Sequence, residues 1–144
     1  MPKYQSPSAV PRRFLLPPER QSITHTFTIG SVTGTITVGL YDDGTPGEVF
    51  ISADKQGSML NGMLQALGAS LSIGLQRGIE LQTYVDKFNM MRFEPMGETD
   101  DESIRQAKSF VDYLAKWLDR RFLAPQRSRR PHLVSVPLKV AAAR

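Results

Sequence analysis

The sequence contains no cysteine among its 144 residues and only two histidines, His25 and His132. Disulfides, thiolate-bound metals, iron–sulfur clusters and cysteine nucleophiles are therefore excluded for these residues. The two histidines have different sequence surroundings, so the sequence predicts no shared metal site. We expect the chain to bind neither a metal ion nor another cofactor.

Long apolar runs are also missing. No stretch approaches the roughly 18 consecutive apolar residues that a membrane helix needs, and the first residues lack the apolar core of a signal peptide. We therefore expect a cytoplasmic protein without a membrane segment.

Motifs of known catalytic centres are absent as well. No serine stands in the Gly-x-Ser-x-Gly pattern of a hydrolase. Gly30 and Gly34 lie between two predicted strands, whereas a dinucleotide-binding loop or a P-loop leads into a helix. The sequence thus predicts no catalytic residue, and we expect no enzymatic activity from this chain by itself.

Positive charge is concentrated at the two ends of the chain. Residues 1–20 contain four bases and one acid, and residues 120–144 contain seven bases and no acid. Residues 21–119 contain 7 bases and 13 acids, although the whole chain has a net charge of +4. The chain therefore has an acidic middle between two basic ends.

Proline marks the first of these ends, because five of the ten prolines lie in residues 1–20 and disfavour regular structure there. The predicted organisation has three parts, namely a proline-rich basic arm (1–20), an α+β domain (21–123) and a basic tail (124–144). We expect residues 1–15 and 125–144 to pack little against the core.

Three segments alternate between apolar and polar residues as half-buried strands do. They are residues 23–29, 35–40 and 48–52, and turn-forming residues join them. Short connections make neighbouring strands antiparallel. The sequence therefore predicts an α+β fold, in which a three-stranded antiparallel β-meander packs against about three helices.

Helical periodicity follows over residues 58–77, 80–90 and 102–122. The apolar residues of the first helix cover more than half of its circumference, so we expect it to be largely buried. Glycine is unfavourable inside helices, and this helix contains Gly62, Gly68 and Gly74. We expect these glycines to let another backbone approach closely.

The third helix is expected to begin in a capping box formed by Thr99 and Glu102. An aromatic stripe, Phe110, Tyr113 and Trp117, runs beside its aliphatic core stripe. This stripe is interpreted either as core or as a subunit interface, since aromatic residues are enriched at interfaces. The second interpretation, together with the small residues of the first helix, predicts a homodimer that uses Tyr113 and Trp117.

Four further positions are candidates for binding. His25 lies on the apolar face of its strand and is either a core histidine or a ligand contact. Arg92, Phe93 and Glu94 stand in a break between helices, where the two charges form an ion pair or a ligand or partner site.

The basic tail offers a weaker candidate, since Arg127, Arg129 and Arg130 could bind phosphates or nucleic acid. The alternative is a solvated tail without a ligand. After Ala124 and Pro125 we expect irregular structure, apart from a short edge strand over residues 133–136.

Residues 16–123 together resemble a known family. Seven segments carry the resemblance: Ser22–Gly30, Thr35–Tyr41, Asp42–Ile51, Ser72–Gly78, Tyr84–Phe88, Arg92–Gly97 and Asp112–Leu114. They are similar, in one unbroken order, to the TSCPD domain found towards the C-terminus of adenosylcobalamin-dependent (class II) ribonucleotide reductases. The match covers about three quarters of the chain.

For full-length reductases the resemblance implies a large barrel with catalytic cysteines, a cobalamin site and a cysteine-containing tail. A chain of 144 residues without cysteine cannot hold these parts. The resemblance therefore implies a non-catalytic accessory or assembly domain that binds a reductase catalytic subunit or itself. The alternative is a small basic protein that binds nucleotides or nucleic acid.

Overall fold

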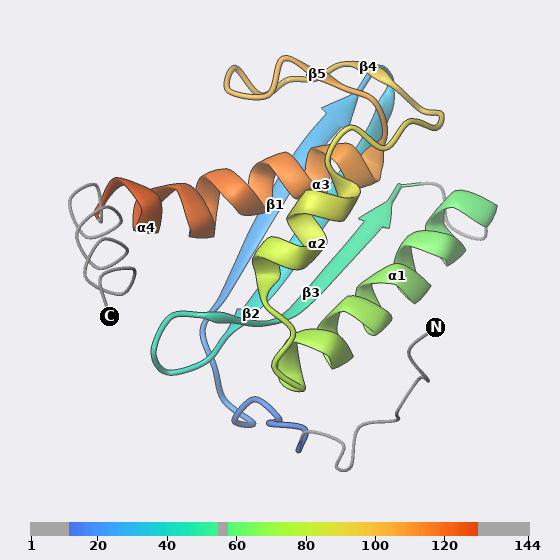
Figure 1. The fold of residues 1–144 in the computed structure, drawn as a ribbon. Coiled ribbons are helices and arrows are strands. Elements are labelled where there is room, and N and C mark those ends of the chain that lie inside the picture. Colours follow the sequence, from blue (N-terminus) through green and yellow to red (C-terminus); the bar gives the residue numbers. More distant parts are fainter. Residues whose placement is uncertain (1–11, 55–57, 130–144) are drawn as a thin grey trace, which may run out of the picture. The chain divides into compact units, whose positions relative to one another are not determined.

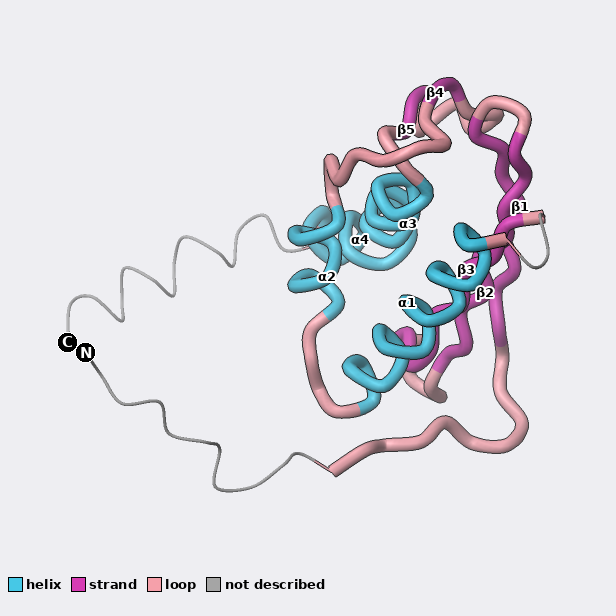
Figure 2. Tube along the Cα trace, turned by 90° about the vertical axis from the view of Figure 1, so that its right-hand side faces the viewer, coloured by secondary structure: helices cyan, strands magenta, loops and turns pink. Residues whose placement is uncertain are grey.

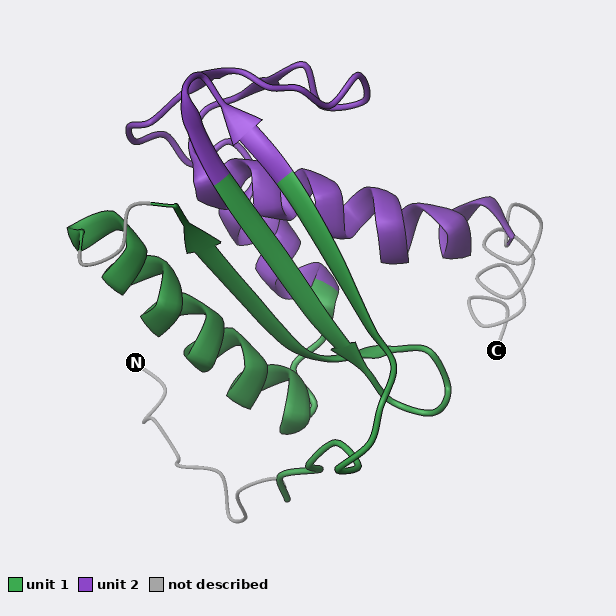
Figure 3. Ribbon diagram, turned by 180° about the vertical axis from the view of Figure 1, so that it is seen from behind, with its two compact units in different colours: residues 1–26, 34–81 green, residues 27–33, 82–144 purple. Residues whose placement is uncertain are grey.

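The computed structural model describes residues 12–54 and 58–129 (Figure 1). The chain divides into two compact units, residues 1–26 with 34–81 and residues 27–33 with 82–144 (Figure 3). In chain order the elements are β1 (Ser22–Ile29), β2 (Val32–Leu40), β3 (Pro46–Ala53), α1 (Met59–Gln76), α2 (Leu81–Phe88), β4 (Gly97–Glu98), β5 (Gln106–Ala107), α3 (Phe110–Leu118), the π-helical turn η1 (Asp119–Leu123) and α4 (Ala124–Ser128).

The three long strands form one antiparallel sheet in the order β1–β2–β3. The predicted meander and the α+β class are thereby confirmed. Alternation buries Ile36 and Val38 completely, as the pattern predicts. Leu40 is only half-buried, because the pairing of β2 with β3 shifts register between Gly39 and Leu40.

Helix α1 of the first unit is one residue shorter at each end than the predicted range 58–77, because Ser58 and Arg77 are its caps. The Ser58 hydroxyl accepts a hydrogen bond from the Asn61 N–H at 3.1 Å and so caps the N-terminus. Gly78 ends the helix with a φ of +93°, a left-handed conformation that glycine adopts without a steric penalty. The Ile79 N–H then donates to the Gly74 carbonyl at 3.0 Å.

Helix α1 runs along β3, which is an edge strand of the sheet (Figures 1 and 2). Three of its buried polar side chains bind the backbone of β3. The Ser72 hydroxyl bonds both the N–H and the carbonyl of Val49, at 2.9 and 3.0 Å. Asn61 accepts from the Ala53 N–H at 3.1 Å, and Gln76 donates to the Gly47 carbonyl at 3.0 Å. The helix thus satisfies and covers the open edge of the sheet.

The glycines of α1 differ in their surroundings. A Cβ on Gly68 would lie 3.0 Å from the Val49 carbonyl oxygen, so the expected close approach of another backbone is confirmed there. A Cβ on Gly62 would meet no described atom within 4 Å. No backbone of the described part of this chain therefore approaches Gly62.

The expectation that α1 is largely buried is also wrong. Met59, Met63 and Ile73 are exposed, although Leu64 and Leu71 are buried. Contact with the strand edge needs polar groups, so Asn61, Ser72 and Gln76 occupy much of the buried side. The apolar residues in excess of the narrow core stripe are left facing outward.

Helix α2 is shorter than the predicted range 80–90, because Met90 takes a left-handed backbone conformation with a φ of 68°. Its apolar side agrees with the predicted pattern. Leu81 and Val85 are buried, while Tyr84 and Phe88 are half-buried and their rings lie 5.8 Å apart.

The predicted start of the third helix is wrong. Residues 97–107 form a β4–β5 hairpin, in which the Thr99 N–H donates to the Arg105 carbonyl at 2.9 Å. The Thr99 hydroxyl serves this loop, since it accepts from the Asp101 N–H at 3.1 Å. Side chains that cap helices also cap turns. Helix α3 begins after Ser109, whose hydroxyl accepts from the Asp112 N–H at 2.9 Å.

The aromatic stripe of α3 is core in the second unit. Phe110, Tyr113 and Trp117 are almost completely buried. Tyr113 stacks on Phe27 with ring centroids 4.0 Å apart, and Phe110 lies 5.2 Å from the same ring. A subunit interface on Tyr113 and Trp117 is thus incompatible with their burial within one chain.

The chain ends differ in part from the predictions. Helical structure continues through η1 into α4, so residues 124–128 are helical rather than irregular. The Phe14 N–H donates to the Gln76 carbonyl at 2.8 Å. Contact with the core therefore begins at or before Phe14, whereas residues 1–15 were expected to pack little against it. The predicted strand over residues 133–136 lies outside the described residues.

Candidate functional site

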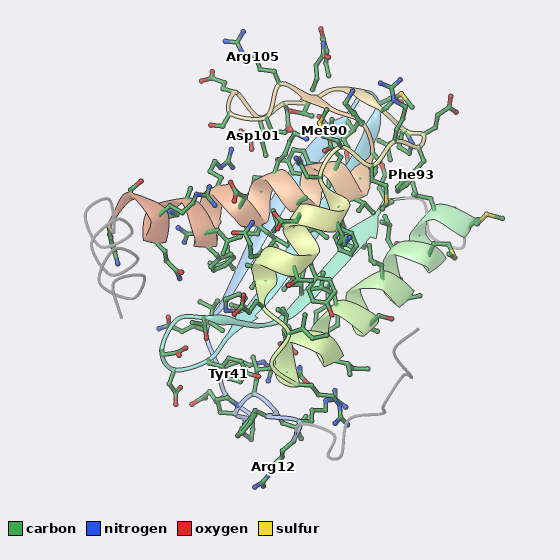
Figure 4. The ribbon with its side chains drawn as sticks, in the orientation of Figure 1. Arg12, Tyr41, Met90, Phe93, Asp101 and Arg105 are labelled. Carbon is green, nitrogen blue, oxygen red and sulfur yellow. The ribbon has the colours of Figure 1, made fainter. Side chains whose placement is uncertain are left out.

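A pocket of about 350 Å³ lies in the second unit, between the segment that follows α2, the β4–β5 hairpin and the start of α3. Figure 4 labels Met90 and Phe93 on that segment and Arg105 on the hairpin. The residues that line the pocket are Met90, Arg92, Met96, Gly97, Gln106, Ala107, Lys108, Asp112 and Lys116. The pocket therefore combines three cations, one carboxylate and two thioethers.

Asp112 binds three of the residues that line the pocket. Its carboxylate is buried and accepts hydrogen bonds from the Met90 N–H at 2.6 Å and the Lys108 N–H at 2.9 Å. Lys116, one helical turn later, forms an ion pair with the same carboxylate. Burial pushes the pKa of Asp112 upward, but these hydrogen bonds outweigh burial and leave the pKa below its usual value. Asp112 is therefore a structural anion that holds three segments together.

Arg92 and Lys108, the other two cations of the pocket, form no ion pair of the kind that Lys116 forms with Asp112. Within residues 12–54 and 58–129, neither side chain forms a hydrogen bond or an ion pair. The Phe93 N–H donates to the Lys108 carbonyl at 3.1 Å, which brings the two cationic residues close along the backbone. The ion pair that one interpretation expects between Arg92 and Glu94 is not formed.

Phe93 and Glu94, the other candidates of this break, do not line the pocket. Phe93 is half-buried and Glu94 is exposed. Lys108 and the two methionines line it, yet no sequence signal singles them out. A lysine beside a helix cap has no distinctive pattern, and only the hairpin brings it to Arg92.

Tyr113 belongs to a second polar cluster instead. Its hydroxyl donates to Asp101 at 2.9 Å, and Arg120 binds both oxygens of that carboxylate at 2.9 Å each. The hydrogen bonds from Arg120 lower the pKa of Asp101 to about 2. Burial, followed by the bond to Asp101, raises the pKa of Tyr113. The cluster joins the hairpin to the helical segment and has the character of a structural brace.

The remaining candidates lie apart from the pocket lining. His25 is half-buried on β1 in the first unit, and Trp117 is a core residue whose ring meets Phe122 edge-on at 6.1 Å. Arg127 forms a bidentate ion pair with Asp119, with N–O distances of 2.8 and 2.9 Å. Arg129 is exposed, and Arg130 lies outside the described residues.

Methionine is the exposed apolar residue that recurs in both units. In the first unit, Met59 and Met63 are 84% and 67% exposed on α1. In the second, Met90, Met91 and Met96 are 55%, 42% and 41% exposed. The flexible thioether suits adaptable binding surfaces. Met59 and Met63 belong to the broad apolar face of the first helix, which the helical periodicity predicts to be buried.

Residues 12–54 and 58–129 form no helix that combines the length and the apolar composition of a membrane span. They also contain no cluster of three or more side chains suited to hold a metal ion.

The fold defines a small α+β domain built on a three-stranded antiparallel meander. The chain belongs to the TSCPD domain family, whose family model matches residues 3–122.

Relatives of known name place this domain within larger proteins. A vitamin B12-dependent ribonucleotide reductase from Rhodopirellula baltica is 50% identical over 114 residues, which are 79% of this chain and 11% of that protein. The reductase of the same name from Streptomyces avermitilis is 49% identical over 113 residues, or 78% and 12% of the two chains. That from Bradyrhizobium diazoefficiens is 36% identical over 104 residues, or 72% and 8%.

The chain thus spans about a tenth of the length of these curated relatives. No solved structure matches it.

Proposed function

We propose that this chain acts as a non-catalytic accessory or assembly domain, which binds a ribonucleotide reductase or a second copy of itself. The observation that carries the proposal is the coverage of the relatives. Proteins named vitamin B12-dependent ribonucleotide reductase align with 79% of this chain but only 11% of their own length. The resemblance implies catalytic cysteines elsewhere in such enzymes, and these 144 residues contain none.

The exposed side of α1 is the proposed partner surface. Met59, Met63 and Ile73 lie along it, and the small residues Gly62 and Ala66 are also exposed there. Apolar side chains that gather on one exposed face are typical of interaction sites. Small residues between the methionines would let a partner helix approach closely. We propose this surface in place of the interface expected at Tyr113 and Trp117, because both residues are buried.

Binding is tested with the purified chain and a purified vitamin B12-dependent ribonucleotide reductase. Light scattering measures self-association against the 16.1 kDa mass of one chain, and biolayer interferometry measures binding to the reductase. Met63→Glu should weaken whichever association occurs by roughly tenfold or more, because it places a charge in an apolar interface. Its free energy of unfolding should change by less than about 0.5 kcal/mol, since Met63 is exposed.

Gln65→Glu is the matched control on the same helix. Gln65 is exposed but lies outside the proposed partner surface, in a pocket that Thr35, Thr37 and Phe50 also line. The control should bind within about twofold of the unaltered chain. A chain that stays monomeric at tens of micromolar and ignores the reductase would refute the proposal, and so would equal effects of the two substitutions.

A further inference from the structure

The pocket of the second unit has an excess of positive charge. Arg92, Lys108 and Lys116 line it together with a single acid, Asp112. Lys116 is already paired with Asp112 and also donates to Asn89 at 3.1 Å. Arg92 is exposed and Lys108 is half-buried, and neither is paired with a carboxylate among the described residues. Glu94 and Glu98 of the same region are not among the lining residues.

The backbone that carries the two cations is held in place before any ligand arrives. The Lys108 N–H is bound to buried Asp112, and its carbonyl accepts the N–H of Phe93, the neighbour of Arg92. Ser109, the next residue, donates its hydroxyl to the Met91 carbonyl at 2.6 Å. The backbone on both sides of each cation is thus hydrogen-bonded, so only the two side chains need to be ordered when a ligand binds.

Phosphate is the anion that this arrangement suits. A guanidinium binds two phosphate oxygens through its planar fork, and an ammonium adds a compact point charge. Gln106 lines the same pocket and offers an amide donor. Met90 and Met96 line it as well, and thioethers make favourable contacts with flat rings.

We propose that this pocket binds a small organic phosphate, with the phosphate on Arg92 and Lys108 and the apolar part of the molecule against Met90 and Met96. The volume of about 350 Å³ lies near the lower end of small-molecule sites, which span roughly 300–1,000 Å³. The basic residues near the end of the described chain are less suited, because Arg127 is already bound to Asp119.

Isothermal titration of the full chain tests the site with four probes: pyrophosphate, ATP, adenosine and a short single-stranded oligonucleotide. Pyrophosphate and ATP should bind with one-to-one stoichiometry, and adenosine should not bind. Arg92→Gln and Lys108→Gln should each raise the dissociation constants of pyrophosphate and ATP by about tenfold, as expected for loss of a charge-assisted hydrogen bond. Met96→Ala should weaken the binding of ATP but not that of pyrophosphate.

Arg105→Gln is the matched control, since Arg105 is exposed on the same hairpin but does not line the pocket (Figure 4). It should bind both phosphates as the unaltered chain does, and circular dichroism should show that every variant remains folded. The proposal is overturned if neither phosphate binds at millimolar concentration. It is equally overturned if Arg105→Gln weakens binding as much as Lys108→Gln, or if only an oligonucleotide binds and does so independently of Arg92 and Lys108.

This proposal and the partner surface on α1 use different residues in different units. Met63→Glu should leave phosphate binding unchanged, and Lys108→Gln should leave partner binding unchanged. Failure of one proposal is therefore distinguishable from failure of the other.

Discussion

Helix α3 is enclosed on nearly all sides, whereas helix α1 keeps one side exposed. From Phe110 to Leu118 every residue of α3 is buried except Lys116. In α1 the exposed residues include Met59, Met63 and Ile73. The sequence predicts a largely buried first helix, and it leaves open whether the aromatic stripe of the third helix is core or interface. The lesson is that apolar content does not by itself tell which helix becomes the centre of a core.

The two helices also differ in how they are attached. Helix α1 is bound to β3 through uncharged side chains, such as Ser72 on the Val49 backbone. Helix α3 is flanked by ionised groups, since Asp112 pairs with Lys116 and Tyr113 donates to Asp101. The contrast predicts different responses to truncation, pH and added volume.

Truncation of the buried helix should have the largest effect. Trp117→Ala should lower the free energy of unfolding by about 3–5 kcal/mol, because a buried aromatic ring is removed and a cavity is left. Urea unfolding followed by circular dichroism measures the change. Met59→Ala on α1 is the matched truncation and should cost less than about 0.5 kcal/mol. Similar costs for the two variants would abolish the distinction between the helices.

Acid should weaken the surroundings of α3 but not the attachment of α1. The pKa of Asp101 is lowered to about 2 by Arg120, so the folded state favours its ionised form. That contribution is present above the unfolded pKa of about 4 and is lost as the pH falls towards 2. Asp101→Asn should therefore cost about 1–2 kcal/mol at pH 7, after allowance for solvent screening at half-exposed Arg120.

The cost of Asp101→Asn should shrink between pH 4 and pH 2, as measured by urea unfolding at each pH. Ser72→Ala provides the comparison on α1, because it leaves the Val49 backbone unpaired without changing a charge. Its cost, about 1–3 kcal/mol, should be the same across this range. A pH-independent cost of Asp101→Asn would mean that its ion pair with Arg120 contributes nothing to stability.

Added volume on α1 should show which side faces the sheet. Gly68→Ala should destabilise by about 1–2 kcal/mol, because the new methyl group presses on the Val49 carbonyl and the strand backbone cannot easily yield. Gly62→Ala meets open space and should stabilise by about 0.5–1 kcal/mol through helix propensity. Thermal unfolding measures both. A stabilising Gly68→Ala would show that the close contact is absent.

Much of the fold could be predicted because its signals are local. The alternation of Ile36 and Val38 follows from the pleat of a strand, and Gly78 ends α1 because it adopts a left-handed conformation. The third helix was misplaced because Thr99 has the same capping chemistry in a loop as at a helix. Ser109, with its bond to the Asp112 N–H, caps the true start.

The candidate pocket was predicted only at Arg92. Lys108 and Met96 join it because β4 and β5 pair, and a pairing of two residues on each strand leaves little trace in composition. The sequence leaves Tyr113 and Trp117 open as core or interface, because the aliphatic stripe is by itself sufficient for a core face, and their burial decides for the core. The stacking of Tyr113 on Phe27 depends on a strand more than 80 residues earlier.

By itself the sequence determined the strand meander, the extent of α1 and the resemblance to the TSCPD domain, since all three reside in patterns along the chain. Tertiary structure alone decided that α1 presents methionine outward, that α3 is enclosed and that Arg92 and Lys108 line one pocket. The physical reason is that burial depends on which distant segments pack together. The open edge of β3 required polar partners, and α1 supplied them at the expense of its apolar burial.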